Sequence, residues 1–338
     1  MSNSKTGYIL MNIGTPSEPT TKGVRTFLKE FLSDPDVIDI NPILRWGIVN
    51  LIVAPFRPRT VLPQYQSIWT NEGSPLLANS EKFKNSLNEF DLELNVEIGM
   101  RYGKPSISDA VDRLIDVGVE KIVLCPMFPQ FAQATTGSCN KKAIEIITSR
   151  GIDYSLIDNF YDEEFYIDCV VNQIKMSDAY KTGDHLLFSF HGLPERQLKK
   201  LDESGEYCLM KPDCCEKQSE FNQLCYKFHC TQTVKKIMEK LNTEKPHTIC
   251  FQSRFGRDKW IDPDILDVLQ NFADDGVENV TVICPSFIAD CLETLEEISI
   301  RDDEIFKEMG GGKLELVPSL NVSNDWVEGF AGFLKRNS

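Results

Sequence analysis

The amino-acid sequence predicts an α/β protein in which two similar halves each carry a doubly wound parallel sheet. Short apolar runs, too short for helices, alternate along the chain with stretches of helical periodicity. One segment of the first half recurs in the second half. Residues 186–194 form an apolar run ending on His191, Gly192 and Pro194, as expected of a buried strand that brings a side chain to the carboxyl edge of a sheet.

The expected strands are short apolar runs bounded by turn residues. In the first, residues 8–14, the sequence Gly14-Thr15-Pro16 ends the run. Strands that alternate with helices of 10–15 residues form parallel βαβ units. Further strands are expected at residues 96–100, 122–126, 186–190, 248–251 and 280–284.

Residues 116–128 and 275–287 form an internal repeat. Both copies run from a helix end through glycine, valine and glutamate into a buried strand, and both leave it as Cys-Pro-x-Phe. A chance likeness between two buried strands is the alternative, and the shared ending argues against it. A repeat at this spacing predicts two similar α/β domains that face one another across a cleft.

Composition excludes some classes of function. The chain has 338 residues, with 36 basic and 51 acidic side chains and a net charge of −15, a field that repels phosphate backbones. General nucleic-acid binding is therefore not expected. The first residues lack the features of a signal peptide, and no window is apolar over the 18 or so residues of a membrane span. We expect a cytoplasmic protein.

His191 is the first candidate for chemistry. Gly192 and Pro194 turn the chain directly after the expected strand, which keeps the imidazole at the strand's carboxyl end. For an isolated histidine, burial in the core is the alternative. A neutral imidazole is a suitable ligand for a first-row divalent metal ion, and equally a suitable base.

An acidic stripe is the second candidate. Read as a helix, residues 288–298 place Asp290, Glu293 and Glu297 on one face. Carboxylates stacked in this way disfavour the helix by a few tenths of a kcal/mol unless a cation faces them. A solvated acidic face is the alternative. Together with His191, these carboxylates could bind a metal ion or relay protons.

Residues 43–56 are apolar and aromatic, and Arg45, Arg57 and Arg59 lie within or beside the segment. The segment is too short to span a bilayer. It is therefore either a core helix or an exposed apolar lip rimmed by cations.

Five of the 11 cysteines lie close together in the pattern C-x5-C-C-x9-C-x4-C. The paired C-x2-C knuckles of zinc ribbons are absent, and disulfides are disfavoured in the cytosol. Four thiolates from one loop suit a [2Fe–2S] cluster, with zinc binding and free thiols as alternatives. One thiol would be spare, either Cys214 or Cys215. The five are Cys208, Cys214, Cys215, Cys225 and Cys230.

In an ordered series of motifs the chain resembles the ferrochelatase family. Each motif is moderately specific, and the ordered set over essentially the whole chain is very specific. The motifs are Arg101-Tyr102, Phe128-Pro129-Gln130-Phe131, Thr135-Thr136-Gly137-Ser138, Ser189-Phe190-His191-Gly192-Leu193-Pro194, Phe251-Gln252-Ser253-Arg254-Phe255-Gly256 with Trp260, and the run from Asp290 to Glu297.

The resemblance implies two similar Rossmann-like, chelatase-type domains, each with a four-stranded parallel sheet flanked by helices. The N-terminal domain would comprise residues 1–155, with a substrate lip at about 40–75 and a C-terminal helix at about 324–338 packing back on it. The C-terminal domain would comprise residues 156–323 and carry the cysteine-rich insertion at about 205–230.

The family's reaction inserts Fe2+ into protoporphyrin IX, forming protohaem with release of two protons in the terminal step of haem biosynthesis. By resemblance, His191 removes the pyrrole protons and shares the metal with Glu293, while Glu297 and Asp290 provide a path for metal or protons. Some members carry a [2Fe–2S] cluster, and some carry histidine where this chain has Cys291. The residues implied to bind porphyrin are Ile13, Tyr65, Arg101, Tyr102 and Trp260.

The segment 43–56 falls on the family's substrate-entry lip, which implies peripheral contact with the inner face of the membrane. Two other functions remain as alternatives. A cobalt chelatase of corrinoid synthesis would share the fold and the histidine, but the Arg101-Tyr102 motif and residues 252–256 argue against it. A non-enzymatic iron–sulfur or haem-binding sensor would bind without turnover. The number of propionates on the ring stays open.

Overall fold

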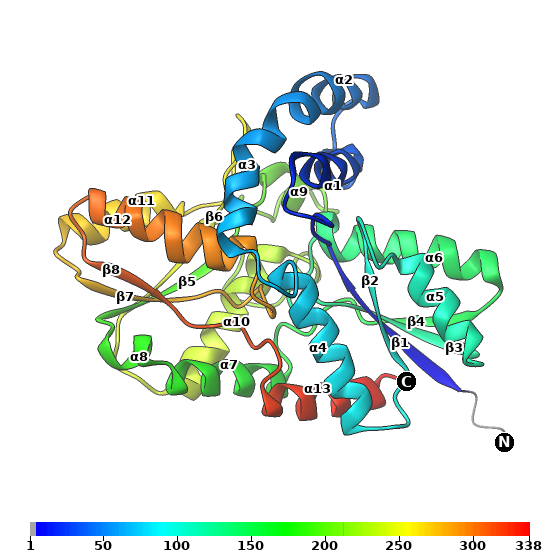
Figure 1. Cartoon of the computed structure of the whole chain (residues 1–338). Coiled ribbons are helices and arrows are strands. Elements are labelled where there is room, and N and C mark those ends of the chain that lie inside the picture. Colours follow the sequence, from blue (N-terminus) through cyan, green and yellow to red (C-terminus); the bar gives the residue numbers. More distant parts are fainter. Residues whose placement is uncertain (1–4, 212) are drawn as a thin grey trace. The chain divides into compact units, whose positions relative to one another are not determined.

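The structure is a computed structural model that describes residues 5–211 and 213–338 (Figure 1). The chain divides into two compact units. The first contains the described residues up to Phe128, with Gln133–Asn159 and Asn321–Ser338, and the second contains Pro129–Ala132 and Phe160–Leu320. Each unit has one four-stranded parallel sheet, in the order β2-β1-β3-β4 in the first and β6-β5-β7-β8 in the second. The predicted α/β class is therefore confirmed.

The sheet of the first unit is buried at its centre. Strands β1 and β3 are almost wholly buried, as their apolar sequences predict. The edge strand β4 is largely exposed, so it lacks the apolar run by which the others could be recognised. The strands are β1 (Thr6–Asn12), β2 (Val96–Met100), β3 (Lys121–Pro126) and β4 (Asp153–Leu156).

Helices cover both faces of this sheet (Figure 1). One face packs on α5 (Ile107–Asp116) and α6 (Ser138–Arg150), which share a core with β1 and β3. On the other side, α4 (Pro75–Phe90) packs on α13 (Asn324–Arg336) through stacked rings of Phe83 and Trp326. The unit also contains α1 (Thr21–Ser33), α2 (Pro42–Gly47), α3 (Ala54–Ile68), and the π-helices η1 (Ile48–Val53) and η2 (Gln133–Gly137).

The second unit repeats this plan. Its sheet has α11 and α12 on one face and α7 and α10 on the other (Figure 1). The strands are β5 (His185–His191), β6 (His247–Gln252), β7 (Asn279–Ile283) and β8 (Lys313–Leu316). The helices are α7 (Glu164–Met176), α8 (Asp178–Thr182), α9 (Glu195–Lys199), α10 (Tyr226–Leu241), α11 (Ile265–Asp274), α12 (Asp303–Glu308) and the π-helix η3 (Leu292–Asp302).

The internal repeat extends to the register of the strands. Asn12 pairs with Met100 at the end of β1, and His191 pairs with Gln252 at the end of β5. In each unit a π-helix follows the strand that ends in Cys-Pro-x-Phe, η2 after β3 and η3 after β7. The carboxyl edges of the two sheets can therefore be compared position by position.

Candidate active site

His191 is the last residue of β5, as predicted. Its Nδ1 lies 2.6 Å from the carbonyl oxygen of Gly192, so Nδ1–H donates and the lone pair of Nε2 is available to a proton or a metal ion. Gly192 cannot be larger, because a Cβ there would lie 2.9 Å from the Gln252 carbonyl oxygen and 3.1 Å from the Trp260 ring. The strand end thus orients the imidazole through a local contact that requires glycine.

Glu293 lies in the first turn of η3 and within electrostatic reach of His191. Burial raises the pKa of the Glu293 carboxyl, and the negative charge of Glu297 raises it further. A hydrogen bond with Cys291 and the charge of His191 oppose this rise without cancelling it. The structure therefore pairs an imidazole acceptor with a carboxyl group whose proton affinity is increased.

Glu297 is held by donors from two elements. Its Oε2 accepts hydrogen bonds from Gln252 Nε2 at 2.9 Å and from the Ser253 hydroxyl, and its Oε1 lies 3.3 Å from Arg301 Nη1. Ser253 has a φ of 66°, in the left-handed region that side chains other than glycine rarely adopt. The Glu297 carboxylate is therefore held in place beside the Arg301 guanidinium, and this cation offsets the repulsion expected between stacked carboxylates.

The acidic segment differs from the expected α-helix. It forms the π-helix η3, which begins after Cys291, so Asp290 precedes the helix and does not share its face. Asp290 Oδ1 instead accepts hydrogen bonds from the Ser319 N–H and the Thr294 hydroxyl, both at 3.2 Å. The apolar periodicity of this segment does not distinguish a π-helix from an α-helix, because either helix buries one stripe of apolar side chains.

Arg301 and Asp302 are site neighbours that no sequence motif indicated. Arg301 Nε donates to Asp302 Oδ1 at 3.0 Å, and Asp302 is fully buried. Burial raises the pKa of Asp302 to about 6, although the charge of Arg301 and its hydrogen bond lower it. Trp260 lies near Gly192, where it pairs with Pro194 and donates from Nε1 to the Phe255 carbonyl at 3.0 Å.

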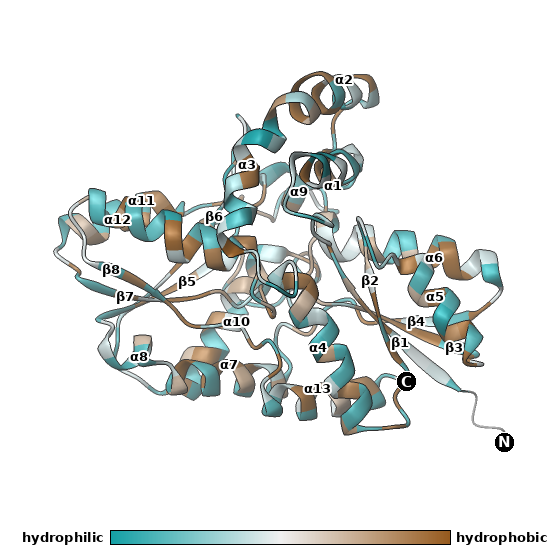
Figure 2. Cartoon of the chain, viewed as in Figure 1, coloured by the Kyte–Doolittle hydropathy of each residue, from teal (hydrophilic) through white to brown (hydrophobic). Residues whose placement is uncertain are grey.

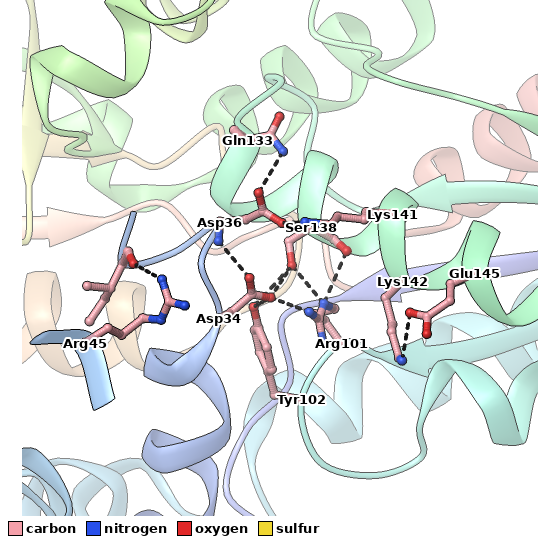
Figure 3. Close-up of polar contacts among 11 residues, drawn as sticks. Asp34, Asp36, Arg45, Arg101, Tyr102, Gln133, Ser138, Lys141, Lys142 and Glu145 are labelled. Atoms are coloured by element: carbon pink, nitrogen blue, oxygen red, sulfur yellow. Dashed lines mark hydrogen bonds and ion pairs between the residues drawn. The ribbon is translucent and has the colours of Figure 1, made fainter. Parts of the chain in front are cut away.

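In the first unit, Arg101 and Tyr102 follow β2 and converge on Asp34 (Figure 3). Asp34 Oδ2 accepts hydrogen bonds from Tyr102 Oη and Ser138 Oγ, each at 2.8 Å, and forms an ion pair with Arg101. Asp34 Oδ1 accepts the Asp36 N–H at 2.8 Å. Burial raises the pKa of Asp34, but these hydrogen bonds and the Arg101 charge outweigh it, so the pKa lies below 3.8.

Ile13 lies beside this network. Its carbonyl oxygen accepts the Tyr102 N–H at 2.9 Å. The next residue, Gly14, has a φ of 101°, and a Cβ there would lie 1.9 Å from the Tyr102 carbonyl oxygen, so only glycine fits. Tyr65 is a buried residue of α3. The structure therefore brings Ile13, Arg101 and Tyr102 together at one sheet edge and places Tyr65 on a separate helix of the same unit.

The cysteine-rich segment brings four thiols into a chain of contacts. Cys225 shares hydrogen bonds with Cys208 and Cys215, and the Sγ atoms of Cys214 and Cys215 are 3.8 Å apart. The hydrogen bonds that Cys225 shares with Cys208 and Cys215 lower the pKa of Cys225, and the same hydrogen bonds, together with burial, raise the pKa values of Cys208 and Cys215. Cys230 lies one turn into α10, where its thiol interacts with the Tyr226 hydroxyl.

Buried polar side chains hold the insertion in place. Asn222 Nδ2 donates to the carbonyl oxygens of Cys214 and Lys217, at 3.0 and 2.8 Å. His229 donates from Nε2 to the Gln223 carbonyl at 2.8 Å and accepts the Phe131 N–H at Nδ1, at 3.1 Å. Within the described part of the chain, no three histidine, cysteine or acidic side chains are arranged around one point to bind a single metal ion.

The segment 43–56 presents an apolar patch on α2, η1 and the start of α3, visible on α2 in Figure 2. Its side chains are more than half exposed, so for these residues the core-helix interpretation is wrong. Arg57 and Arg59 beside it are also exposed. None of the helices among the described residues is long and apolar enough to cross a membrane. The patch consists of Ile43, Leu44, Trp46, Leu51, Ile52 and Phe56, exposed by 57–81%.

Known proteins resemble the chain over nearly its whole length. A sequence model of the ferrochelatase family matches residues 5–338. The ferrochelatase of Coxiella burnetii (strain Dugway 5J108-111) is 41% identical over 339 residues, which cover 99% of this chain and 94% of that protein. The ferrochelatase of Bdellovibrio bacteriovorus is 38% identical over 335 residues, covering 98% of this chain and 99% of its own.

Two solved structures share the fold at low sequence identity. SirB from Bacillus subtilis with Fe3+ has a TM-score of 0.53 and 11% identity, covering 77% of this chain and 88% of SirB. The sirohydrochlorin chelatase SirB from Bacillus subtilis subspecies spizizenii in complex with cobalt has a TM-score of 0.52 and 12% identity, covering 80% and 92%. The structural likeness shows the chelatase fold, and the sequence matches show that the chain belongs to the ferrochelatase family.

Proposed function

We propose that this ferrochelatase, an enzyme that inserts iron into a porphyrin for haem synthesis, uses protoporphyrin IX as the ring, His191 as the base and Glu293 as its partner. The observation that carries the proposal is that His191, with Nδ1 engaged by the Gly192 carbonyl and Nε2 left available, lies within electrostatic reach of the buried Glu293 carboxyl. Imidazole and carboxylate are ligands of first-row divalent ions and are also proton acceptors.

The proposed reaction balances as Fe2+ plus the neutral porphyrin giving the iron porphyrin and two protons. Each pyrrole N–H bond breaks with its electron pair left on nitrogen, and that pair forms the bond to iron. His191 Nε2 accepts the two protons one after the other, passing the first on before the second leaves the ring, because Nδ1–H is already donated to the Gly192 carbonyl. The Glu293 carboxylate would stabilise the resulting imidazolium and take over the proton, in keeping with its raised pKa.

The ring is proposed to bind against Ile13, Tyr65, Arg101 and Trp260, with Tyr102 acting through Arg101. Tyr102 is 1% exposed and its hydroxyl donates to Asp34, so its proposed part is to set the position of Arg101. Arg101 is also paired with Asp34 and stacks on Tyr102, with 4.6 Å between Cζ and the ring centroid. Asp290 and Glu297 are proposed as the path by which protons or metal reach His191 and Glu293.

Anaerobic turnover tests the assignment of substrate and metal. Wild-type protein is supplied with Fe2+ and either protoporphyrin IX or coproporphyrin III, and separately with Co2+ and sirohydrochlorin. Faster formation of protohaem supports the proposal. Preference for the four-propionate ring would correct the substrate, preference for cobalt and sirohydrochlorin would favour the corrinoid alternative, and tight porphyrin binding without product would favour a sensor.

We also propose that Cys208, Cys214, Cys215 and Cys225 hold a [2Fe–2S] cluster, which would supply an iron–sulfide core that cross-links the loop. A chain of thiol contacts supports this proposal, because Cys225 shares hydrogen bonds with Cys208 and Cys215, and Cys214 lies beside Cys215. Cys230 is the proposed spare thiol, in place of Cys214 or Cys215, because it interacts with Tyr226 on α10. The cysteine-rich loop would stabilise the protein or act as a sensor, because the proposed chemistry is carried by His191 and Glu293.

A matched pair of variants tests the cluster. Cys225→Ser should abolish visible charge-transfer absorption and bound iron and sulfide, and should lower the midpoint of thermal unfolding. Cys230→Ser should retain all three properties. Purified wild type without iron and sulfide, or a Cys225→Ser protein with unchanged spectrum and stability, would contradict the cluster, and bound zinc in wild type would favour the zinc alternative.

Finally, we propose that the apolar patch on α2, η1 and α3 binds the inner face of the membrane, a surface of anionic lipid. Exposed apolar side chains beside the exposed cations Arg57 and Arg59 support an amphipathic lipid contact. Vesicles with anionic lipid should shift the Trp46 emission to the blue, neutral vesicles less so. Phe56→Ser should weaken binding, whereas Phe90→Ser, on an exposed aromatic side chain of α4, should not.

A further inference from the structure

Gln252 joins the two elements that carry the proposed catalytic pair. It is the last residue of β6 and pairs in register with His191 on β5. Its side chain is fully buried, so it cannot contact a substrate. Its Nε2 lies 2.9 Å from both the Glu293 carbonyl oxygen and Glu297 Oε2. Gln252 therefore connects the His191 strand to the first turns of η3.

The orientation of the Gln252 amide is determined by its third contact. Ser189 Oγ, also fully buried, donates to Gln252 Oε1 at 2.8 Å. The amide nitrogen is then directed at two acceptors, the Glu293 carbonyl oxygen and a carboxyl oxygen of Glu297. The Gln252 carbonyl oxygen also accepts the Gly192 N–H at 2.8 Å, directly after His191. Both polar atoms of the side chain are thus engaged, and the backbone of Gln252 holds the residue that follows His191.

We infer that Gln252 is a positioning residue for metal insertion, which sets the separation between His191 and Glu293 through its two amide hydrogen bonds. The inference rests on the proposed function of that pair. A carboxylate at this position would face the Glu297 carboxylate and the Glu293 carbonyl with no proton to donate. Loss of such outer partners of metal ligands costs about 10- to 100-fold in metal affinity or activity.

The test compares Gln252→Glu with Gln130→Glu. Gln130 is a second buried glutamine of the same unit, hydrogen-bonded to Thr233 and Ser286 and remote in sequence from η3. Both changes introduce a buried carboxylate and should lower thermal stability. Gln252→Glu alone should lower kcat/KM for Fe2+ by about 10- to 100-fold, with the KM for porphyrin changed less than about threefold. Lost stability alone would not lower kcat/KM for Fe2+ while leaving the KM for porphyrin nearly unchanged.

Gln252→Asn serves if the glutamate variant does not fold, because it retains the amide but is too short to reach both acceptors. Equal losses in the Gln252 and Gln130 variants, or a loss confined to porphyrin binding, would overturn the positioning role. His191→Ala is run alongside: an active His191→Ala enzyme would contradict the proposed function itself, whereas an inactive one beside a fully active Gln252→Glu enzyme would contradict this inference alone.

Discussion

The two units use the same sheet edge in opposite ways. Strand β1 ends in Asn12, and the equivalent strand β5 ends in His191. In each unit, a residue just after the neighbouring strand, β2 or β6, contacts the helical segment that follows the strand of the repeat, β3 or β7. In the first unit Arg101 donates to Ser138 and pairs with Asp34. In the second unit, the Ser253 hydroxyl donates to Glu297, which occupies the position equivalent to that of Ser138 in the first unit.

Under the proposed function, one architecture divides ring binding from proton chemistry. Asp34 is a carboxylate saturated by donors, with a pKa below its ordinary value, so it stays charged and rigid. Burial raises the pKa values of the Glu293 and Asp302 carboxyls, that of Asp302 to about 6, so these groups bind a proton more readily than Asp34 does. We therefore expect substitutions in the first unit to alter stability and ring binding, and substitutions in the second to alter turnover.

The largest effect is expected at Glu293. Glu293→Gln removes the proposed proton acceptor while keeping the shape of the side chain, and should lower kcat by about 100- to 10,000-fold, the range of general acid–base catalysis. Glu304→Gln, an exposed residue of α12, is the control and should retain activity. Porphyrin binding, followed by fluorescence, should be preserved. A Glu293→Gln enzyme with near-normal kcat would remove the distinction between the two edges.

Asp34→Asn should affect stability most in the first unit. It leaves Arg101 without its buried counter-charge, a loss that costs about 3–5 kcal/mol in comparable pairs. Urea unfolding measures this change, and porphyrin KM should rise while the kcat at saturation stays within about threefold. Glu297→Gln should show the reverse pattern, with a larger loss of kcat and a smaller loss of stability. If both variants lost mainly stability, or both lost mainly kcat, the contrast between the two units would be contradicted.

The same contrast predicts opposite pH dependence. The lowered pKa of Asp34 means that its contribution to stability is complete above its unfolded-state pKa, near 3.8, and disappears as the pH falls through the lower folded-state pKa. Asp302, with a pKa raised to about 6, favours the folded state when protonated. Relative to Asp302→Asn, wild type should therefore lose up to about 3 kcal/mol as the pH rises from about 4 to above 6.

Unfolding free energies of wild type and the two asparagine variants, measured across this pH range, test the prediction. The unfolding free energy of wild type minus that of Asp302→Asn should fall with rising pH. The difference for Asp34→Asn should stay constant above about pH 5 and shrink only in stronger acid. Two differences that vary in the same direction would contradict the assigned pKa shifts.

The smallest effect is expected at Ser138. Ser138→Ala removes one hydrogen bond to Asp34 and one from Arg101, but the ion pair between those two residues remains. The expected cost is about 1–3 kcal/mol of unfolding free energy, without a change in iron insertion at saturation. A larger loss of turnover would show that the first edge takes part in the chemistry.

Much of the contrast between the two units could be predicted from the sequence, because it depends on short local patterns. The run 96–100 coincides with β2, and residues 186–191 lie within β5, so the apolar pattern alone places His191 at a strand end. The internal repeat likewise reflects two buried strands with the same ending. These features depend on residues adjacent in the chain.

The remainder depends on contacts between distant residues. Nothing near Asp34 in the sequence indicates that it meets Arg101, Tyr102 and Ser138, and the amide orientation of Gln252 depends on Ser189. The π-helical hydrogen bonding of η3, which leaves Asp290 outside the helix, is also set by packing. Four thiols in contact, with Cys230 on a separate helix turn, likewise follow from the fold of the loop.

Iron insertion by His191→Ala and Asn12→Ala tests the central claim most directly, because the two residues occupy equivalent strand ends. Asn12 Oδ1 accepts only its neighbour's N–H among the contacts described, at 2.8 Å from Ile13 N. With Fe2+ and protoporphyrin IX under anaerobic conditions, His191→Ala should lose at least about 100-fold in kcat while Asn12→Ala stays within about threefold of wild type. An active His191→Ala enzyme, or equal losses in both, would contradict the assignment of chemistry to the second unit.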